Sequence, residues 1–216
     1  MKDMEKKEIA EILLSSKAVT LSPDKPYTYA SGIKSPIYCD NRLLLSDVEA
    51  RRKIVDSFEE MFKEKGVAFD SVAGTATAGI PWAAWVAEEE NAPLIYVRSN
   101  KKEHGKKNKI EGKVRKGKKT LVIEDLISTG GSSVSAVEAV KQAGAKVDTC
   151  AAIFTYEMKK AEDRFKRINC NILALTDFST LVEVAVEKKY ITKKQASVIA
   201  DWNKNPESWG EKYGFY

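Results

Sequence analysis

The sequence predicts an α/β protein with a mainly parallel central sheet and helices on both of its faces. Strand and helix patterns alternate from residue 70 to residue 175, which is typical of parallel sheets whose crossovers are helices. Three unusual loops follow the expected strands, after residues 73, 98 and 124. Because ligands of such sheets gather at the carboxyl ends of the strands, the three loops are expected to meet at one site.

Length and composition favour a single globular domain over residues 1–216. The apolar runs are much shorter than the roughly 20 residues that span a bilayer. The charged N-terminus lacks the apolar core of a signal peptide, and the three widely spaced cysteines suggest no disulfide framework. We therefore expect a cytoplasmic protein with no membrane partner.

The positive charge of the chain is concentrated in one segment. The whole chain has a net charge of +5. Residues 101–119 contain ten Lys or Arg and two Glu, a balance of +8, which leaves −3 for the rest of the chain. This localisation predicts an anion site and not a general nucleic-acid-binding face. No nucleic-acid partner is expected.

The first quarter of the chain predicts a helix, a set of short strands and a second helix. Residues 3–16 have an apolar stripe among charged residues, the pattern of an amphipathic helix. Residues of about 20–45 are rich in Pro, Gly, Ser and Tyr and predict either a surface hairpin or a hood over a site. Ser46 followed by Glu49 predicts a capping box, and the helix it starts is expected to end at Gly66.

Two further loops before the middle of the chain are candidates for ligand binding. The short strand at 70–73 leads into a turn of glycines and hydroxyls, Gly74–Gly79, with Pro81 near the first helical position. This turn is either a pyrophosphate site or an ordinary helix start. The strand at 93–98 leads into residues 99–112, which are rich in lysine and contain the only histidine. This long loop is either a solvated linker or a mobile lid that brings cations to a polyanionic substrate.

The most informative stretch is Thr120–Ser133, which reads TLVIEDLISTGGSS. It combines an apolar strand, two carboxylates where that strand is expected to end, and a turn of glycines and hydroxyls before a helix. Glycines let the backbone approach a ligand, and free N–H groups at a helix start attract anions. The carboxylates suit sugar hydroxyls, a developing positive charge or magnesium. The stretch predicts a sugar-phosphate site, with an ordinary acidic strand–helix turn as the alternative.

The rest of the chain continues the alternation and ends in an aromatic tail. The tail from Pro206 onward is expected to dock on the protein surface. The other expected elements are a helix ending at Gly144, a strand at 146–155, a helix at 159–168, a strand at 172–175, and helices starting at Ser179 or Thr180 and at Thr192.

Along nearly its whole length the chain resembles the orotate phosphoribosyltransferases, a family of type I phosphoribosyltransferases. The segments that carry the resemblance are Ser31–Asp40 (SGIKSPIYCD), Gly74–Pro81, Arg98 with Lys102–Gly105, and Glu124–Ser132. The resemblance implies the type I phosphoribosyltransferase fold with a small N-terminal hood, and a flexible catalytic flap at about residues 99–113.

The implied activity is that of an enzyme, a pentosyltransferase of pyrimidine biosynthesis. It would transfer phosphoribosyl from 5-phospho-α-D-ribose 1-diphosphate (PRPP) to orotate and release orotidine 5′-monophosphate and pyrophosphate. The implied cofactor is Mg²⁺, held mainly by the pyrophosphate without a direct protein ligand. The implied partners are PRPP, orotate and a second copy of the chain, in a homodimer whose flap reaches the neighbouring subunit's site.

The resemblance also implies roles for individual residues. Lys102, His104 and Asp125 are the expected catalytic residues, and an unperturbed histidine pKa of about 6.5 suits protonation of the leaving pyrophosphate. Orotate is expected to contact Ser128, Lys34 and Tyr38. The expected PRPP-binding residues are Arg98, Lys102, His104, Glu124, Asp125, Leu126, Ile127, Ser128, Thr129, Gly130, Gly131 and Ser132.

The acceptor side departs most from the family pattern. Ala30, Ala78 and Ser99 stand where many relatives have basic residues, so the orotate carboxylate must be bound in another way. Two alternative functions stay open on the sequence alone. One is a type I phosphoribosyltransferase for a purine or another base, and the other is a PRPP-sensing regulator.

Overall fold

A six-stranded sheet forms the centre of the computed structural model, which describes residues 3–99 and 109–215. The strand order is β10-β9-β8-β5-β6-β7, and all neighbours are parallel except β7, which runs antiparallel to β6. The strands are β5 (Ser71–Thr75), β6 (Leu94–Val97), β7 (Ile110–Glu111), β8 (Thr120–Ile127), β9 (Thr149–Thr155) and β10 (Asn171–Asp177).

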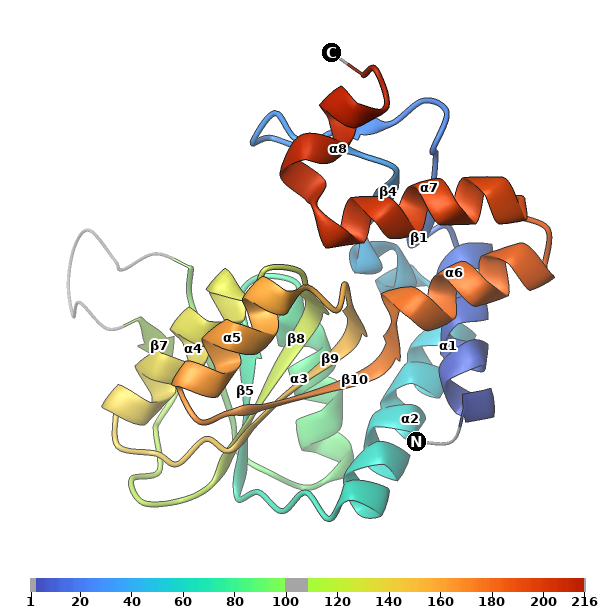
Figure 1. Cartoon of the computed structure of the whole chain (residues 1–216). Coiled ribbons are helices and arrows are strands. Elements are labelled where there is room, and N and C mark those ends of the chain that lie inside the picture. Colours follow the sequence, from blue (N-terminus) through green and yellow to red (C-terminus); the bar gives the residue numbers. More distant parts are fainter. Residues whose placement is uncertain (1–2, 100–108, 216) are drawn as a thin grey trace.

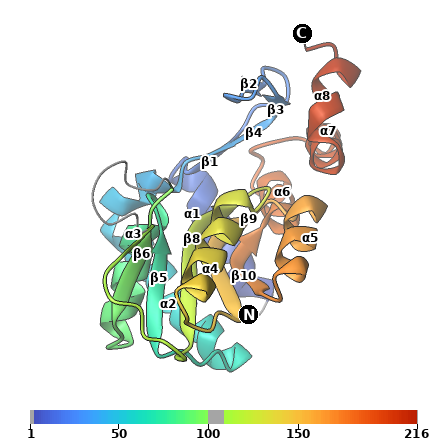
Figure 2. The same cartoon turned by 90° about the vertical axis from the view of Figure 1, so that its left-hand side faces the viewer.

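Helices cover both faces of this sheet (Figure 1; Figure 2). On one face lie α4 (Gly131–Gln142) and α5 (Lys159–Arg167). The other face carries α1 (Asp3–Ser15), α2 (Val48–Lys65), α3 (Gly79–Glu89) and α6 (Phe178–Glu187). The predicted fold class, α/β with a mainly parallel sheet between two helical layers, is confirmed.

The first half of strand β8 shows why residues 121–123 form an apolar run. Leu121 and Ile123 pack into the core beneath α1, α2 and α3, whereas Val122 packs into the separate core beneath α4 and α5. Successive side chains of a strand point to opposite faces, and both faces of this sheet are covered. Residues on both faces of this part of the strand are therefore apolar.

The hood lies above the carboxyl ends of the strands, together with the last two helices (Figure 1). Its strands form two antiparallel pairs, and the tail docks beside them as predicted, with Trp209 buried and its indole N–H donating to the Val198 carbonyl at 2.9 Å. The elements are β1 (Val19–Leu21) paired with β4 (Ile37–Cys39), β2 (Tyr27–Thr28) paired with β3 (Lys34–Ser35), α7 (Lys193–Lys204) and α8 (Pro206–Lys212).

Two predicted boundaries near the site are wrong. Strand β8 continues to Ile127 because its last residues pair with β9, so the acidic pair lies within the strand and not at its end. The predicted capping box at Ser46 is also absent. Asp47 caps α2 by accepting from the N–H of Ala50 at 3.0 Å, while Ser46 is the last residue of the 3-10 helix η1 (Asn41–Ser46). A carboxylate is well suited to the positive end of the helix dipole.

Part of the predicted long loop is a strand. Ile110 and Glu111 form β7 and pair with β6, and the N–H of Arg98 donates to the Lys109 carbonyl at 2.8 Å. A strand of two residues is too short to show an alternating pattern in the sequence. The segment between β6 and β7 thus begins and ends on one edge of the sheet.

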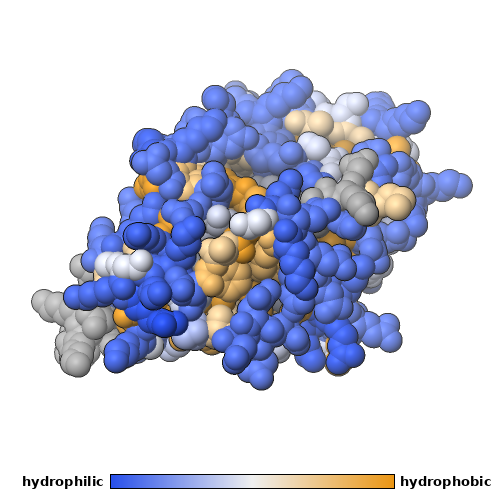
Figure 3. All heavy atoms as spheres, turned by 90° about the horizontal axis from the view of Figure 1, so that it is seen from below, coloured by the Kyte–Doolittle hydropathy of each residue, from blue (hydrophilic) through white to orange (hydrophobic). Residues whose placement is uncertain are grey.

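The face opposite the hood is mostly hydrophilic, with an apolar area near its middle (Figure 3). Across the described ranges, no helix has both the length and the apolar character needed to cross a membrane. The two pockets described below lie at the other end of the sheet, where the strands end beneath the hood.

Candidate active site

The turn after β8 exposes backbone N–H groups at the start of α4. Gly130 has φ +75°, a left-handed conformation that favours glycine, and α4 begins at Gly131. A Cβ at Gly130 would lie 3.2 Å from the Phe165 ring and 3.3 Å from the Ala161 side chain. Glycine therefore lets the turn pack against α5 while its N–H groups stay free for an anion.

A second glycine turn is pressed against β8. A Cβ at Gly79 would lie 2.6 Å from the Ile123 carbonyl oxygen, so only glycine permits this approach. The start of α3 consequently lies on the strand immediately before Glu124. This contact brings the preceding turn residues beside the acidic pair.

A pocket of about 370 Å³ joins these parts, and we call it the phosphate pocket. Two of the three loops expected at the site meet here. Of the predicted PRPP-binding residues in β8 and its turn, all except the fully buried Ile127 line the pocket. The lining residues are Ala76, Thr77, Ala78, Glu124, Asp125, Leu126, Ser128, Thr129, Gly130, Gly131 and Ser132.

The two carboxylates of β8 differ in exposure, since Glu124 is buried and Asp125 is half-buried. The Glu124 side chain is buried and accepts from the hydroxyls of Ser133 at 3.0 Å and Ser132 at 3.4 Å. Burial, reinforced by the charge of Asp125, raises the pKa of Glu124 well above its usual value. Burial also raises the pKa of Asp125. Both carboxyls therefore favour a ligand that offers hydroxyl groups or positive charge.

The hood is tied to the acidic strand by Asn41, a residue that the sequence analysis missed. Its buried side-chain amide donates to the backbone carbonyl of Asp125 at 2.9 Å. Next to it, Arg42 makes a two-pronged contact with Asp40 at 2.6 and 2.8 Å. No local pattern could identify Asn41, because its partner lies 84 residues away and is a main-chain atom.

A second pocket, of about 410 Å³, adjoins the first, and we call it the acceptor pocket. Ser128 and Thr129 line both pockets. Most of the acceptor pocket could not be predicted from the sequence, because its walls come from the hood, the start of α5 and the last two helices. The lining residues are Tyr29, Ser31, Ile33, Ser128, Thr129, Met158, Lys159, Lys160, Trp202, Asn203, Lys204, Asn205, Pro206 and Glu207.

The three predicted orotate-binding residues are placed differently. Ser128 lies where the two pockets meet. Lys34 donates from its ammonium group to the Thr28 hydroxyl at 3.2 Å, and Tyr38 is 43% exposed with its ring 5.5 Å from that of Tyr27. Neither Lys34 nor Tyr38 is among the described residues that line the two pockets.

The predicted basic residues are only partly within the described structure. Arg98 follows β6, and its guanidinium lies 3.6 Å from the Glu111 carboxylate. At the other end of this segment, the Lys109 ammonium donates to the Ser135 hydroxyl of α4 at 2.5 Å. Lys102 and His104 lie outside the described residues, so their predicted roles stay predictions.

Known proteins similar to this chain agree with the geometry. A profile described as the phosphoribosyl transferase domain matches residues 45–188. The orotate phosphoribosyltransferase of Listeria innocua is 53% identical over 205 residues, which cover 95% of this chain and 98% of that protein. That of Coxiella burnetii is 50% identical, covering 94% and 97%.

A solved structure has the same architecture. The crystal structure of orotate phosphoribosyltransferase from Aeropyrum pernix matches with a TM-score of 0.74 and 27% identity, covering 85% of this chain and 99% of that one. The profile spans the sheet and both glycine turns, and the relatives match almost from end to end. The chain therefore belongs to the orotate phosphoribosyltransferase family.

Proposed function

We propose that the protein transfers the phosphoribosyl group of PRPP to orotate and releases pyrophosphate, a step of pyrimidine biosynthesis. The observation that carries this proposal is the phosphate pocket, in which an acidic pair, Glu124 buried and Asp125 half-buried, faces a glycine turn at a helix start. The name of the relatives, which match over nearly their full length, specifies orotate as the acceptor.

The turn at 128–132 is the proposed site of the 5-phosphate. Free N–H groups at the start of α4 and the hydroxyls of Ser128, Thr129 and Ser132 surround this end of the pocket. Such groups bind a phosphate because the helix dipole and the donors together favour negative charge, and the Arg164 guanidinium, which donates to the Thr129 carbonyl at 2.8 Å, adds positive charge.

The acidic pair is the proposed binding site of the ribose. Glu124 and Asp125 would accept hydrogen bonds from the ribose hydroxyls. During transfer the bond between C1 and the pyrophosphate oxygen breaks and a bond from C1 to the acceptor nitrogen forms. Positive charge develops on the ribose as the pyrophosphate leaves, and two nearby carboxylates stabilise it. That charge also lowers the pKa of both carboxyls, which burial had raised.

The acceptor pocket is the proposed site of orotate. Tyr29, Met158 and Trp202 provide apolar and aromatic surface for a flat ring, and Ser128 connects this pocket to the phosphate pocket. Lys159 and Lys160 also line it. They offer cations for the orotate carboxylate, which the alanines at positions 30 and 78 cannot provide.

Magnesium fits the phosphate pocket as a companion of the substrate. Among residues 3–99 and 109–215, no cluster of three or more His, Cys, Asp and Glu side chains could hold a metal ion. The pyrophosphate of PRPP would supply most of the ligands of the ion, and the two nearby carboxylates of β8 favour positive charge in this pocket. When bound, the ion would neutralise charge on the leaving pyrophosphate.

We further infer a cytoplasmic homodimer in which the flap at about 99–113 serves the neighbouring subunit's site. In this arrangement Arg98, Lys102 and His104 contact the pyrophosphate, and His104 protonates it. Support comes from the family pattern and from the ten basic residues of the 101–119 segment. Sedimentation of the protein with and without PRPP would test the dimer.

A turnover assay with PRPP, Mg²⁺ and either orotate or a purine base tests the proposed function. We expect the absorbance of orotate to fall and that of the purine to stay constant. No loss of orotate absorbance at any protein concentration would overturn the proposal. Sequence-specific DNA binding that survives physiological salt would instead favour the regulator.

A further inference from the structure

Glu157 occupies an unusual position between β9 and α5. Its φ is +54°, in the left-handed region that a residue with a Cβ rarely adopts. The next residue, Met158, is buried and lines the acceptor pocket. Rare backbone conformations persist only where surrounding contacts determine them strongly, so the contacts of Glu157 explain how this turn is held.

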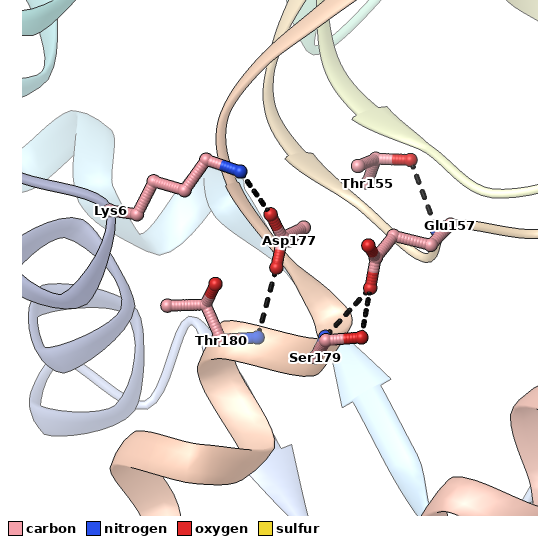
Figure 4. A network of polar contacts seen from close by, with 6 residues as sticks. All are labelled: Lys6, Thr155, Glu157, Asp177, Ser179 and Thr180. Carbon is pink, nitrogen blue, oxygen red and sulfur yellow. Dashed lines mark hydrogen bonds and ion pairs between the residues drawn. The ribbon is translucent and has the colours of Figure 1, made fainter. Parts of the chain in front are cut away.

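The Glu157 carboxylate binds the first turn of a distant helix (Figure 4). It accepts from the backbone N–H of Ser179 at 2.8 Å and from the Ser179 hydroxyl at 2.6 Å. Asp177 accepts from the next amide, that of Thr180, at 2.9 Å, and Lys6 donates to Asp177 at 2.6 Å. Two carboxylates thus satisfy successive N–H groups at the start of α6.

The backbone of Glu157 continues the network towards the site. Its N–H donates to the Thr155 hydroxyl at 3.1 Å, and that hydroxyl donates to the Ile127 carbonyl at 3.2 Å. The N–H of Tyr156 donates to the same carbonyl at 3.0 Å. Ile127 immediately precedes Ser128, so these bonds fix the chain just before the residue that both pockets share.

Two further contacts link the turn to the acceptor pocket itself. The Ser128 hydroxyl lies 4.0 Å from the Met158 sulfur, to which it donates a weak hydrogen bond. The side-chain amide of Asn203, another lining residue, donates to the Tyr156 carbonyl at 2.6 Å. Residues 156–158 therefore contact two lining residues, Ser128 and Asn203, on different walls of the pocket, whereas Glu157 itself does not line it.

We propose that Glu157 is a positioning residue for the acceptor. Its carboxylate anchors the left-handed turn to α6, and the turn in turn holds Met158 and Ser128 in place around the flat ring. Glu157 itself touches no substrate. This inference rests on the proposed function in that it takes the acceptor pocket as the place where the base binds.

Steady-state kinetics of Glu157→Ala test the assignment. We expect the KM for orotate to rise about fivefold, in keeping with the loss of charge-assisted hydrogen bonds at an exposed position. The KM for PRPP should change less than about twofold, since the anion-binding N–H groups follow a strand that stays paired. Glu157→Gln keeps an acceptor oxygen and should restore most of the affinity for orotate.

Two more variants separate the possible causes. Glu157→Gly removes the carboxylate and also relieves the left-handed backbone, so it should raise the KM for orotate as much as alanine does. Glu162→Ala removes an equal charge from α5, where Glu162 faces Lys166 at 3.9 Å, and should leave both KM values unchanged. Recovery of the KM in Glu157→Gly would overturn the role of the carboxylate.

Equilibrium binding of orotate, followed by tryptophan fluorescence, distinguishes this inference from the proposed function. Trp202 lines the acceptor pocket and provides the signal. Absence of turnover in the wild type together with weaker orotate binding in Glu157→Ala would contradict the proposed function and support the positioning role. Equal orotate affinity in the wild type and Glu157→Ala, or equal changes for PRPP and orotate, would overturn the positioning role.

Discussion

The phosphate pocket is lined by residues from two short segments, 76–78 and 124–132, whereas the acceptor pocket is lined by residues from the hood, the start of α5 and the last two helices. Main chain and small side chains dominate the first pocket, and large side chains dominate the second. A pocket made of main chain depends on a few backbone conformations. A pocket made of side chains depends on how distant elements dock, so the two should respond differently to substitution.

We expect the largest effect on turnover from Asp125, one of the two acidic residues of the phosphate pocket. Asp125→Asn should lower kcat about 10²–10³-fold, because it removes a charge that stabilises the developing cation. The circular dichroism spectrum and the melting temperature should remain those of a folded protein. Asp148→Asn is the matched control, since Asp148 is 65% exposed and pairs only loosely with Lys119 at 3.8 Å. Full activity in Asp125→Asn would remove this residue from the mechanism.

The backbone of the phosphate turn gives the next effect. Gly130→Ala forces a side chain into a left-handed position and against Phe165, at a cost of about 1–3 kcal/mol. We expect the KM for PRPP to rise about tenfold, equivalent to about 1.4 kcal/mol. Gly117→Ala is the control, because Gly117 has the same φ of +75° with no atom within 4 Å of the added Cβ. Similar KM values in both variants would refute the steric argument.

A side-chain change in the acceptor pocket should act on one substrate only. The Tyr29 hydroxyl donates to the Ile37 carbonyl at 2.8 Å, accepts from the Ser35 hydroxyl at 3.0 Å and lies 3.4 Å from the Tyr156 hydroxyl. Tyr29→Phe removes these bonds and should raise the KM for orotate about threefold, at about 0.5–1.5 kcal/mol per hydrogen bond. Tyr190→Phe, at a residue 51% exposed, is the control. A change in the KM for PRPP alone would contradict the division into two pockets.

We expect the smallest effect on the melting temperature of the protein without bound substrate. Burial raises the pKa of Glu124, so the folded protein binds the proton of this carboxyl more tightly than the unfolded chain does. Proton binding therefore stabilises the folded state at low pH, and this stabilisation is lost as the pH rises above about 4.3. At neutral pH, Glu124→Gln should therefore raise the melting temperature by about 2–4 °C, for a gain of about 1 kcal/mol.

The pH dependence provides the control for that variant. Below about pH 4, the Glu124 carboxyl is protonated in both states, so the two proteins should melt at similar temperatures. Melting curves from pH 4 to pH 8 measure the difference. A wild type that becomes more stable than Glu124→Gln as the pH rises would show that Glu124 is ionised and well accommodated in the free protein.

The phosphate pocket could be predicted because one strand–turn–helix unit contains most of it. Apolar residues at 121–123, two acids and a pair of glycines follow local rules that hold in any parallel sheet. The predicted end of β8 was wrong because pairing with β9, about 30 residues further along the chain, decides where the strand ends. Asp47 replaced Ser46 as the cap because η1 uses Ser46 as its last residue.

The acceptor pocket could not be predicted in the same way. Trp202 donates to the Lys34 carbonyl at 3.1 Å across 168 residues of sequence, and this contact helps to set where the hood lies. The side chains of Lys34 and Tyr38 contact other hood residues, and their predicted contact with orotate stays a prediction. Docking between distant elements decides such orientations, and no periodic pattern in the sequence encodes it.

Because Ser128 and Thr129 line both pockets, we expect PRPP and orotate to be thermodynamically linked if each binds in its proposed pocket. Any free energy that PRPP spends on ordering these two residues no longer opposes the binding of orotate, and the reverse also holds. Linkage requires that PRPP change the affinity for orotate by the same factor as orotate changes the affinity for PRPP. A shared two-residue wall is thus a short physical route for cooperativity within one subunit.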